Sequence, residues 1–252
     1  MSGLPTAAEV LGGVDLTGRT ALVTGGYSGI GVEVVRALAG AGATVLVPAR
    51  RPSVAAAAVA DIEGVEVGEL DLADQASVAS YADALVAAGR PIDVVIGNAG
   101  VMACPETRIG PGWELQLATN HLGHFALVNR LAPLLGAESR VVSVSSTGHH
   151  LSGIRWDDPW FETGYDKWLA YGQSKTANVL FAVHLAKLGV RAYSLHPGAI
   201  LTPLGRHLQE SDLDAVMTLD ADGQPVLQPQ SAQQMWHMAS LARSTGIHAL
   251  HS

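Results

Sequence analysis

Two side chains that could exchange a proton, Tyr171 and Lys175, lie four residues apart in a stretch that predicts a helix. A spacing of four places both on one helical face, about one turn apart. A phenol has an ordinary pKa near ~10, too high for a base at neutral pH, and a neighbouring ammonium lowers that pKa. The pair therefore predicts a proton donor and acceptor suited to carbonyl reduction or alcohol oxidation. Because Tyr-x-x-x-Lys is a common spacing, this interpretation depends on the surrounding motifs.

A glycine-rich turn spans residues 24–31, with the sequence TGGYSGIG. It follows an apolar run typical of a strand and opens a stretch that predicts a helix. Glycines in this position let the backbone turn tightly and approach a pyrophosphate, whose charge the helix N-terminus stabilises. The turn thus predicts dinucleotide binding, and a purely structural glycine turn is the alternative.

Two basic residues, Arg50 and Arg51, come directly after the second expected strand. No Asp or Glu lies near this strand end in the sequence. A carboxylate there would suit the ribose 2′-hydroxyl of NAD, whereas a basic residue suits the 2′-phosphate of NADP. Arg50 therefore favours NADP(H) over NAD(H), and a solvated arginine is the alternative. Asp71, after the third strand, is placed to contact the adenine edge. Alternatively, Asp71 or Asp74 caps the next helix.

The elements that must position these residues alternate along the chain. Apolar, β-rich runs predict strands at Thr20–Thr24, Thr44–Ala49, Val65–Leu70, Asp93–Gly97, Arg140–Ser145, Val190–His196 and, last, Gly246–Leu250. Helical stretches lie between them at Ile30–Ala39, Val54–Ile62, Gln75–Ala88, Trp113–Leu135 and Lys167–Leu188. Continuously apolar strands separated by helices indicate a parallel sheet that is buried on both faces.

This alternation predicts an α/β fold with a doubly wound parallel sheet, the Rossmann arrangement. At 252 residues the chain suits one well-filled α/β domain. We expect residues 1–15 to form a loose N-terminal arm and residues 16–252 a single NAD(P)-binding domain. A substrate-loop region is expected over about residues 199–231.

Composition excludes several classes of protein. Hydrophobic residues make up 48% and charged residues 15%, which argues against disorder. The net charge of −8, without a basic stripe, argues against nucleic-acid binding. We read no signal peptide and no apolar run long enough to span a bilayer, and the single cysteine, Cys104, excludes an internal disulfide. A cytoplasmic protein without membrane partners is expected.

Ten histidines and a cluster of aromatic residues have less specific interpretations. The histidine pairs lack a carboxylate or thiolate that would complete a recognised ligand set, so no metal site is predicted. The aromatic cluster either walls an apolar substrate site or anchors a long loop. Its members are Trp156, Trp160, Phe161 and Trp168.

Five motifs occur in one order over about residues 15–205. They are the glycine turn at 24–31, Asn98-Ala99-Gly100 after the fourth strand, Ser145-Ser146 after the fifth, Tyr171 with Lys175, and Pro197-Gly198 with Thr202 after the sixth. Each is weak alone, but together and in register they resemble the short-chain dehydrogenase/reductase family. Tyr27 departs from the small or polar residue that the family often has in the glycine turn.

The resemblance implies roles for four residues. Ser146, which fits the family pattern better than Ser145, would hydrogen-bond the substrate oxygen, and Tyr171 would give or take the proton. Lys175 would hold the nicotinamide ribose and lower the pKa of the tyrosine. Asn120 would bind a water in a proton relay. The residues implied to contact the cofactor are Gly25, Ser28, Gly29, Ile30, Gly31, Arg50, Asp71, Leu72, Asn98, Ala99, Gly100, Tyr171, Lys175, Pro197, Gly198, Ile200 and Thr202.

A long segment between Ser146 and Tyr171, together with residues 120–125 (NHLGHF), resembles the branch with retinol-dehydrogenase-like and protochlorophyllide-reductase-like enzymes. Members of this branch mostly use NADP(H), in agreement with Arg50. The expected function is hydride transfer between NADP(H) and a small-molecule ketone, aldehyde or alcohol. The alternatives are a non-catalytic NADP-binding sensor and an NAD-dependent epimerase or dehydratase. The resemblance also implies a homodimer or homotetramer built on the two long helices.

Overall fold

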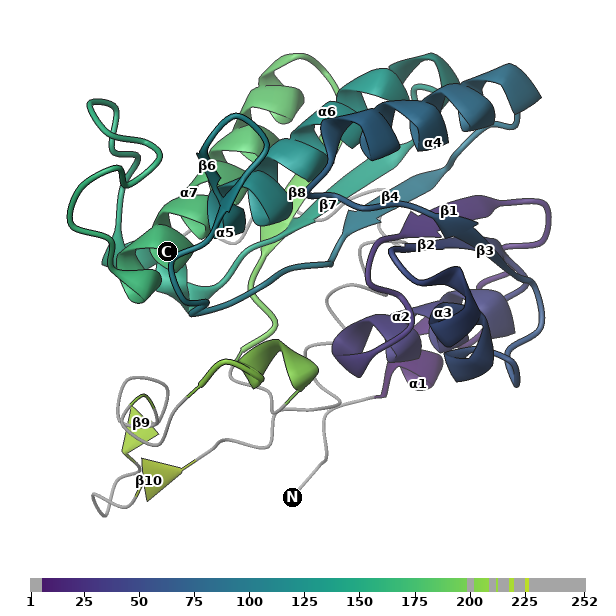
Figure 1. Cartoon of the computed structure of the whole chain (residues 1–252). Helices are drawn as coiled ribbons and strands as arrows, with labels where there is room; N and C mark the ends of the chain where they lie inside the picture. Colours follow the sequence, from purple (N-terminus) through teal and green to yellow (C-terminus); the bar gives the residue numbers. More distant parts are fainter. Residues whose placement is uncertain (1–5, 199–201, 209–211, 213–217, 220–224, 227–252) are drawn as a thin grey trace.

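A sheet of six parallel strands forms the centre of the molecule (Figure 1). The computed structural model describes residues 6–198, 202–208, 212, 218–219 and 225–226. The strands are β1 (Thr20–Val23), β2 (Thr44–Ala49), β3 (Val65–Glu69), β4 (Val94–Gly97), β7 (Arg140–Val144) and β8 (Arg191–Leu195). Their spatial order is β3-β2-β1-β4-β7-β8, with every pairing parallel. This order is that of the dinucleotide-binding Rossmann fold, so the predicted fold class is confirmed.

Helices cover both faces of the sheet, as Figure 1 shows. On one face lie α2 (Gly29–Gly40) and α3 (Pro52–Ala58), and α2 buries Val34, Val35 and Leu38 against the strands. On the other face lie α4 (Gln75–Ala88), α6 (Gly123–Arg130) and α7 (Lys167–Lys187), which bury a second apolar cluster. The central strands are mostly apolar because both of their faces are covered, and β1 is buried at all four residues.

The long helix expected over Trp113–Leu135 is divided in the structure. Trp113–Glu114 forms strand β6 of a small antiparallel hairpin with β5 (Arg108–Ile109). A helical run then passes through α5 (Leu115–Leu117), a π-helical turn η1 (Ala118–Leu122) and α6. The prediction was wrong at its start because Trp113 stacks on Trp160, at 5.7 Å between ring centroids. It was wrong at its end because Pro133 lies in a separate 3-10 turn, η2 (Ala132–Leu134).

The first residues also differ from the expected loose arm. Residues Ala7–Leu11 form α1, and the Thr6 hydroxyl and the Glu9 carboxylate complete a capping box at its start. Ala7 and Leu11 pack with Ala37 and Ala41 beside α2. Burial of these small apolar side chains fixes the segment, which sequence periodicity over five residues could not reveal.

The remaining described elements are short. They are the 3-10 turns η3 (Thr147–Leu151) and η4 (Pro203–Gly205), and the antiparallel pair β9 (Thr218–Leu219) and β10 (Pro225–Val226). Ile200, the strand expected at Gly246–Leu250 and most of the expected substrate loop lie outside the described residues. Within the described part of the chain, no helix combines the length and apolarity that crossing a bilayer requires.

Candidate active site

The residues predicted to do chemistry gather where the parallel strands end. Thr24 and Gly25 follow β1, Asn98–Gly100 follows β4, Ser145 and Ser146 follow β7, and Pro197 and Gly198 follow β8. The strand order reverses between β1 and β4, and ligands of open α/β sheets bind in the crevice at this reversal. The region at the strand ends beside this reversal, which we call the crevice, is therefore the candidate active site.

The glycines of the turn after β1 are required by close approaches of the backbone. Gly25 has a φ of 64°, and a Cβ there would lie 3.0 Å from Cα of Ala99. A Cβ on Gly31 would lie 2.1 Å from the carbonyl oxygen of Gly25. Ser28, at the N-cap of α2, makes no side-chain hydrogen bond to the first turn of that helix. The turn thus presents bare backbone at a helix N-terminus, which suits a pyrophosphate.

The segment after β8 crosses the same turn. A Cβ on Gly29 would lie 3.1 Å from Cβ of Thr202, so this threonine lies against the glycine turn. Gly198 adopts a φ of 86°, a left-handed conformation that glycine tolerates without strain. Thr202 consequently lies close to the predicted cofactor residues of the glycine turn, while Pro197 and Gly198 precede it in the segment after β8.

The end of β2 carries exposed Arg50 and Arg51, and no ion pair among the described residues engages either one. Sequence reasoning missed that a carboxylate reaches this edge from the neighbouring strand. Glu69 ends β3 and is the register partner of Ala49. Strand pairing, which a local reading of β2 cannot show, brings Glu69 beside the arginines.

Asp71 and Leu72 were both predicted to contact the cofactor, but their side chains have different surroundings. Asp74, and not Asp71, is the N-cap of α4, accepting from the backbone N–H of Ala76. The Asp71 carboxylate accepts instead from the N–H of Ala73 at 2.9 Å. The Leu72 side chain is 6% exposed and belongs to the core, so only its backbone remains for the predicted cofactor contact.

Tyr171, Lys175 and Asn120 are all buried at the end of the sheet near β7. The ammonium of Lys175 lies 5.5 Å from the centre of the Tyr171 ring and donates to the carbonyl oxygen of Val144 at 3.1 Å. The side chain of Asn120 donates to Val101 and Ser174 and accepts from the Val101 N–H, all within 2.9 Å. The structure therefore brings together the pair that the spacing predicted and adds the asparagine beside it.

The two serines after β7 have different surroundings. The buried hydroxyl of Ser145 donates to the backbone carbonyl of Lys175 at 2.8 Å. Ser146 hydrogen-bonds the Tyr171 phenol, and its hydroxyl also accepts from the N–H of Gly148. A Cβ on Gly148 would lie 2.8 Å from the ring of Tyr171. Glycine at 148 thus lets the serine and tyrosine approach each other, and this geometry favours Ser146 over Ser145 as the partner of Tyr171.

The pKa values of the pair differ from the expectation drawn from spacing. Burial raises the pKa of Tyr171 to about 12, although the hydrogen bond from Ser146 acts to lower it. Burial also lowers the pKa of Lys175 to about 8. The expected lowering of the tyrosine pKa by the ammonium is absent because removal of both groups from water dominates. In this state the phenol is a proton donor at neutral pH.

Comparisons with known proteins identify the family. A family model described as short chain dehydrogenase matches residues 19–213. A "Probable oxidoreductase" of Streptomyces lividans is 46% identical over 222 residues, covering 83% of this chain and 74% of that protein.

The chain belongs to the short-chain dehydrogenase/reductase family.

Its retinol-dehydrogenase-like branch is also supported by the comparisons. Retinol dehydrogenase 12 of Bos taurus is 40% identical over 206 residues, which cover 77% of this chain and 65% of that enzyme. A crystal structure of an uncharacterized protein from Mycobacterium paratuberculosis superposes with a TM-score of 0.71 at 36% identity, covering 96% and 98% of the two chains. The Pseudomonas aeruginosa RhlG/NADP active-site complex superposes at 0.67 with 26% identity, covering 90% of each.

The aromatic residues 156, 160, 161 and 168 of this short-chain dehydrogenase do not share one role. Some anchor the long loop before α7, and one lies near the candidate active site. Trp160 stacks on Trp113, and Phe161 is fully buried under the guanidinium of Arg155, so both anchor the long loop before α7. Trp156 is 80% exposed. Trp168 alone lies beside the catalytic candidate, with its ring 6.5 Å from that of Tyr171.

Asp212 is a residue near the site that sequence reasoning missed. Its buried carboxylate accepts from the ammonium of Lys167 at 2.6 Å and from the indole N–H of Trp168 at 3.3 Å. The contact joins residues 45 positions apart, and no local pattern announces it. Asp212 thereby ties the chain after β8 to the first turn of α7, next to Tyr171.

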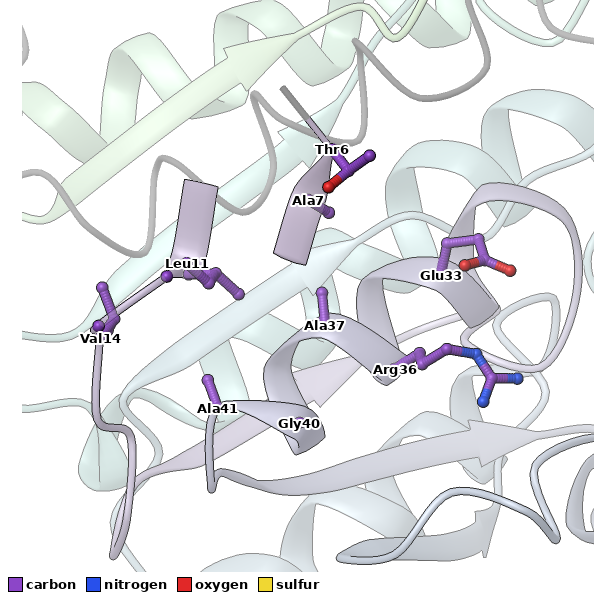
Figure 2. A pocket seen from close by; sticks show the side chains of 11 residues that line it. Thr6, Ala7, Leu11, Val14, Glu33, Arg36, Ala37, Gly40 and Ala41 are labelled. Carbon is purple, nitrogen blue, oxygen red and sulfur yellow. The ribbon is translucent and has the colours of Figure 1, made fainter. Parts of the chain in front are cut away.

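A separate hollow of about 480 Å³ lies between α1 and α2. Figure 2 shows Thr6, Leu11 and Val14 on one side of it and Glu33, Arg36 and Ala37 of α2 on the other. No predicted site residue lines this hollow, and Arg36 pairs outward with Asp61 at 2.8 Å. The hollow reflects the docking of α1 and is distinct from the crevice.

Proposed function

We propose that the protein interconverts a ketone or aldehyde and the corresponding alcohol with NADP(H) as cofactor. The observation that carries the proposal is the cluster of buried Tyr171, Lys175 and Asn120 with half-buried Ser146, at the end of β7 and the start of the crevice. Membership of the family supplies the reaction class. A small-molecule substrate held in the crevice would place its oxygen between Ser146 and Tyr171.

The chain's own residues perform binding and proton transfer in this proposal. Ser146 donates a hydrogen bond to the substrate oxygen, and Tyr171 gives its phenolic proton to that oxygen during reduction or takes it back during oxidation. The ammonium of Lys175 stabilises negative charge that develops near the phenol. Asn120 fixes the loop at Val101 beside this lysine. When bound, the nicotinamide exchanges the hydride.

The glycine turn fits the pyrophosphate of such a cofactor. Side chains are sterically excluded at Gly25 and Gly31, and the first turn of α2 is not capped by Ser28. Asn98 and Ala99, just after β4, lie against this turn, since a Cβ on Gly25 would touch both of them, and Gly100 follows beside Asn120 and Lys175. The bare turn, the family and the NADP complexes among the structural neighbours together support a nicotinamide dinucleotide.

The choice of NADP(H) over NAD(H) rests on Arg50. We expect Arg50→Ala to weaken NADPH binding about tenfold or more while changing NADH binding less than twofold, because only NADPH carries the 2′-phosphate. Titration of cofactor fluorescence measures both dissociation constants. Arg51→Ala is the matched control for a nearby exposed arginine. Equal effects of Arg50→Ala on both cofactors would contradict the assignment. So would a wild type that binds NADH more tightly than NADPH, as expected if Glu69 held the ribose 2′-hydroxyl.

The reaction itself is tested by Tyr171→Phe. Loss of the phenolic hydroxyl should reduce kcat by at least about a hundredfold, because proton transfer by a positioned group contributes on this scale. NADPH affinity should stay within about threefold of the wild type, since the ring is retained. Initial rates with a panel of aldehydes, ketones and secondary alcohols provide the measurement. A variant with preserved turnover, or a wild type inactive on the whole panel despite tight NADPH binding, would refute the proposed function.

The partner proposed for this enzyme, besides its substrate, is a second copy of the chain. An exposed apolar face runs along α7 at Leu169, Leu180 and Val183, and Phe125 of α6 adjoins it. Phe125 lies 5.3 Å from Phe181 of α7, measured between ring centroids. A continuous apolar surface over two packed helices favours self-association, in accord with the homodimer or homotetramer expected from the family.

A further inference from the structure

A ring of hydrogen bonds, partly buried at Asn98 and Ala99 and buried elsewhere, encloses the loop between β4 and the hairpin. The ring comprises Thr24, Asn98, Ala99, Val101, Asn120 and His124. The Thr24 hydroxyl accepts from the N–H groups of Asn98 and Ala99, both at 3.0 Å. At the other end of this loop, Asn120 binds both the N–H and the carbonyl of Val101. The loop is thus held at its two ends by two different side chains.

His124 connects these two holding residues. Its Nδ1 lies 2.9 Å from the backbone carbonyl oxygen of Asn120, and its Nε2 lies 2.8 Å from the Thr24 hydroxyl. Its side chain is buried and belongs to α6, one turn after Asn120 in the π-helical turn η1. His124 therefore closes a ring that runs from the strand end of β1, through the loop after β4, to the helix that carries Asn120.

The partners determine where the proton of His124 resides. A carbonyl oxygen only accepts, so Nδ1 must carry the hydrogen and donate it to Asn120. Nε2 is then an acceptor for the Thr24 hydroxyl, whose lone pairs already accept the N–H groups of Asn98 and Ala99. Burial lowers the pKa of His124 to about 4, which keeps the imidazole neutral at physiological pH. Donors and acceptors of the ring are matched in this one tautomer.

The sequence leaves space for this histidine. A Cβ on Gly97 would lie 3.1 Å from Cδ2 of His124, tighter than ordinary packing allows. Gly100 is equally constrained, because a Cβ there would lie 3.1 Å from Oδ1 of Asn120 and 3.8 Å from Nζ of Lys175. The loop that the ring holds is therefore packed between the glycine turn and the catalytic lysine, and a small displacement of it moves both.

We propose that His124 is a positioning residue for the reaction, fixing the loop at residues 98–101 against both the cofactor turn and Lys175 by joining Thr24 to Asn120. The inference rests on the proposed function for its kinetic consequence. Misplacement of reacting groups by about 1 Å can cost a hundredfold in rate. Loss of the ring should therefore lower kcat more than it raises the KM of the carbonyl substrate.

The test compares His124→Phe, which keeps an aromatic ring without hydrogen bonds, with His124→Asn. In this helix Asn129 donates to the carbonyl of Phe125, four residues earlier, at 2.7 Å, so an asparagine at 124 can restore the bond to Asn120. We expect His124→Phe to lower kcat at least tenfold and to weaken NADPH binding severalfold. His124→Asn should recover part of both losses.

The matched control is His121→Phe, at a partly buried histidine of the same helical run that bonds Asn178 outside the ring. Its kcat should stay within about threefold of the wild type. If His124→Phe is folded and changes neither kcat nor NADPH affinity by more than twofold, the proposal is overturned. A failure of the wild type to turn over any substrate would refute the proposed function alone, because NADPH affinity still reports on the loop.

Nitrogen NMR of the wild type, with 15N-labelled histidine, reports on His124 without any turnover or mutation. We expect the neutral Nδ1–H form, assigned by its loss in His124→Asn, without titration between about pH 5.5 and 8.5. An Nε2–H tautomer or a protonated ring in this range would overturn the proposed ring.

Discussion

The catalytic candidates combine two buried titratable groups whose pKa values move apart on burial. Burial raises that of Tyr171 and lowers that of Lys175. At neutral pH this arrangement holds a phenol that can donate and an ammonium that remains mostly charged. In the proposed function such a site would favour carbonyl reduction, whereas alcohol oxidation would require the tyrosine to accept a proton.

This arrangement predicts opposite pH dependences for the two directions. The pKa of Lys175 is lowered to about 8, so its ammonium is present below that pH and is lost as the pH rises through it. The rate of carbonyl reduction should therefore fall above about pH 8. Alcohol oxidation should rise with pH over the same range, because the minor phenolate fraction of Tyr171 grows as the pH approaches its pKa of about 12. Initial rates in both directions from about pH 6 to 10 measure this.

Circular dichroism over the same pH range is the control for unfolding. A reduction rate that increases steadily from neutral to alkaline pH, with the fold intact, would contradict the assigned protonation states.

Among the helices, the start of α6 depends on a close approach between chain segments. A Cβ on Gly123 would lie 2.3 Å from the carbonyl oxygen of Leu72, in the loop before α4. Since Leu72 belongs to the core, neither segment can move away freely. The contact sets the position of the helix that carries His124.

We expect Gly123→Ala to lower the free energy of unfolding by about 1–3 kcal/mol, because forcing extra atoms into a packed contact outweighs the higher helix propensity of alanine. Gly40→Ala, at the end of α2, is the matched control, since a Cβ there meets nothing within 4 Å. That variant should be stabilised slightly, by up to about 1 kcal/mol. Urea unfolding distinguishes them, and equal stability of the two variants would refute the steric argument.

At the scale of the whole molecule, the described residues leave an exposed apolar face on α6 and α7, which is the proposed contact with a second copy of the chain. Leu180 and Val183 are 48% and 46% exposed in the middle of a long helix whose other face is buried. Exposed apolar residues grouped on one helical face mark interaction surfaces. A symmetric pairing of this face would bury it against its own copy.

Leu180→Glu should therefore convert an assembled protein to the monomer, because a carboxylate cannot be buried against an apolar partner without a large cost. Sedimentation velocity should show a mass of about 26.1 kDa for the variant and a multiple of it for the wild type. Val54→Glu, at a similarly exposed position on α3 in the opposite layer, should leave assembly unchanged. A wild type that sediments as a monomer would contradict the proposed partner.

Local sequence alone determined several features of the fold and of the candidate site. The bounds of β2 and α4 agree with their predictions, since apolar runs and capping residues act within a few positions of one another. The same holds for the placement of Tyr171 and Lys175 on one helical face, and for the order of motifs that identified the family. Helical periodicity and the parallel alternation suffice for these conclusions.

Contacts between distant segments were decided only by the tertiary structure. Trp160 removes Trp113 from the expected helix, strand pairing brings Glu69 to the edge near Arg50, and Asp212 reaches Trp168. The pKa of Tyr171 likewise followed its burial and not its spacing from Lys175. Burial, register and hydrogen bonds across the fold depend on how layers pack, and a linear pattern carries no measure of that packing.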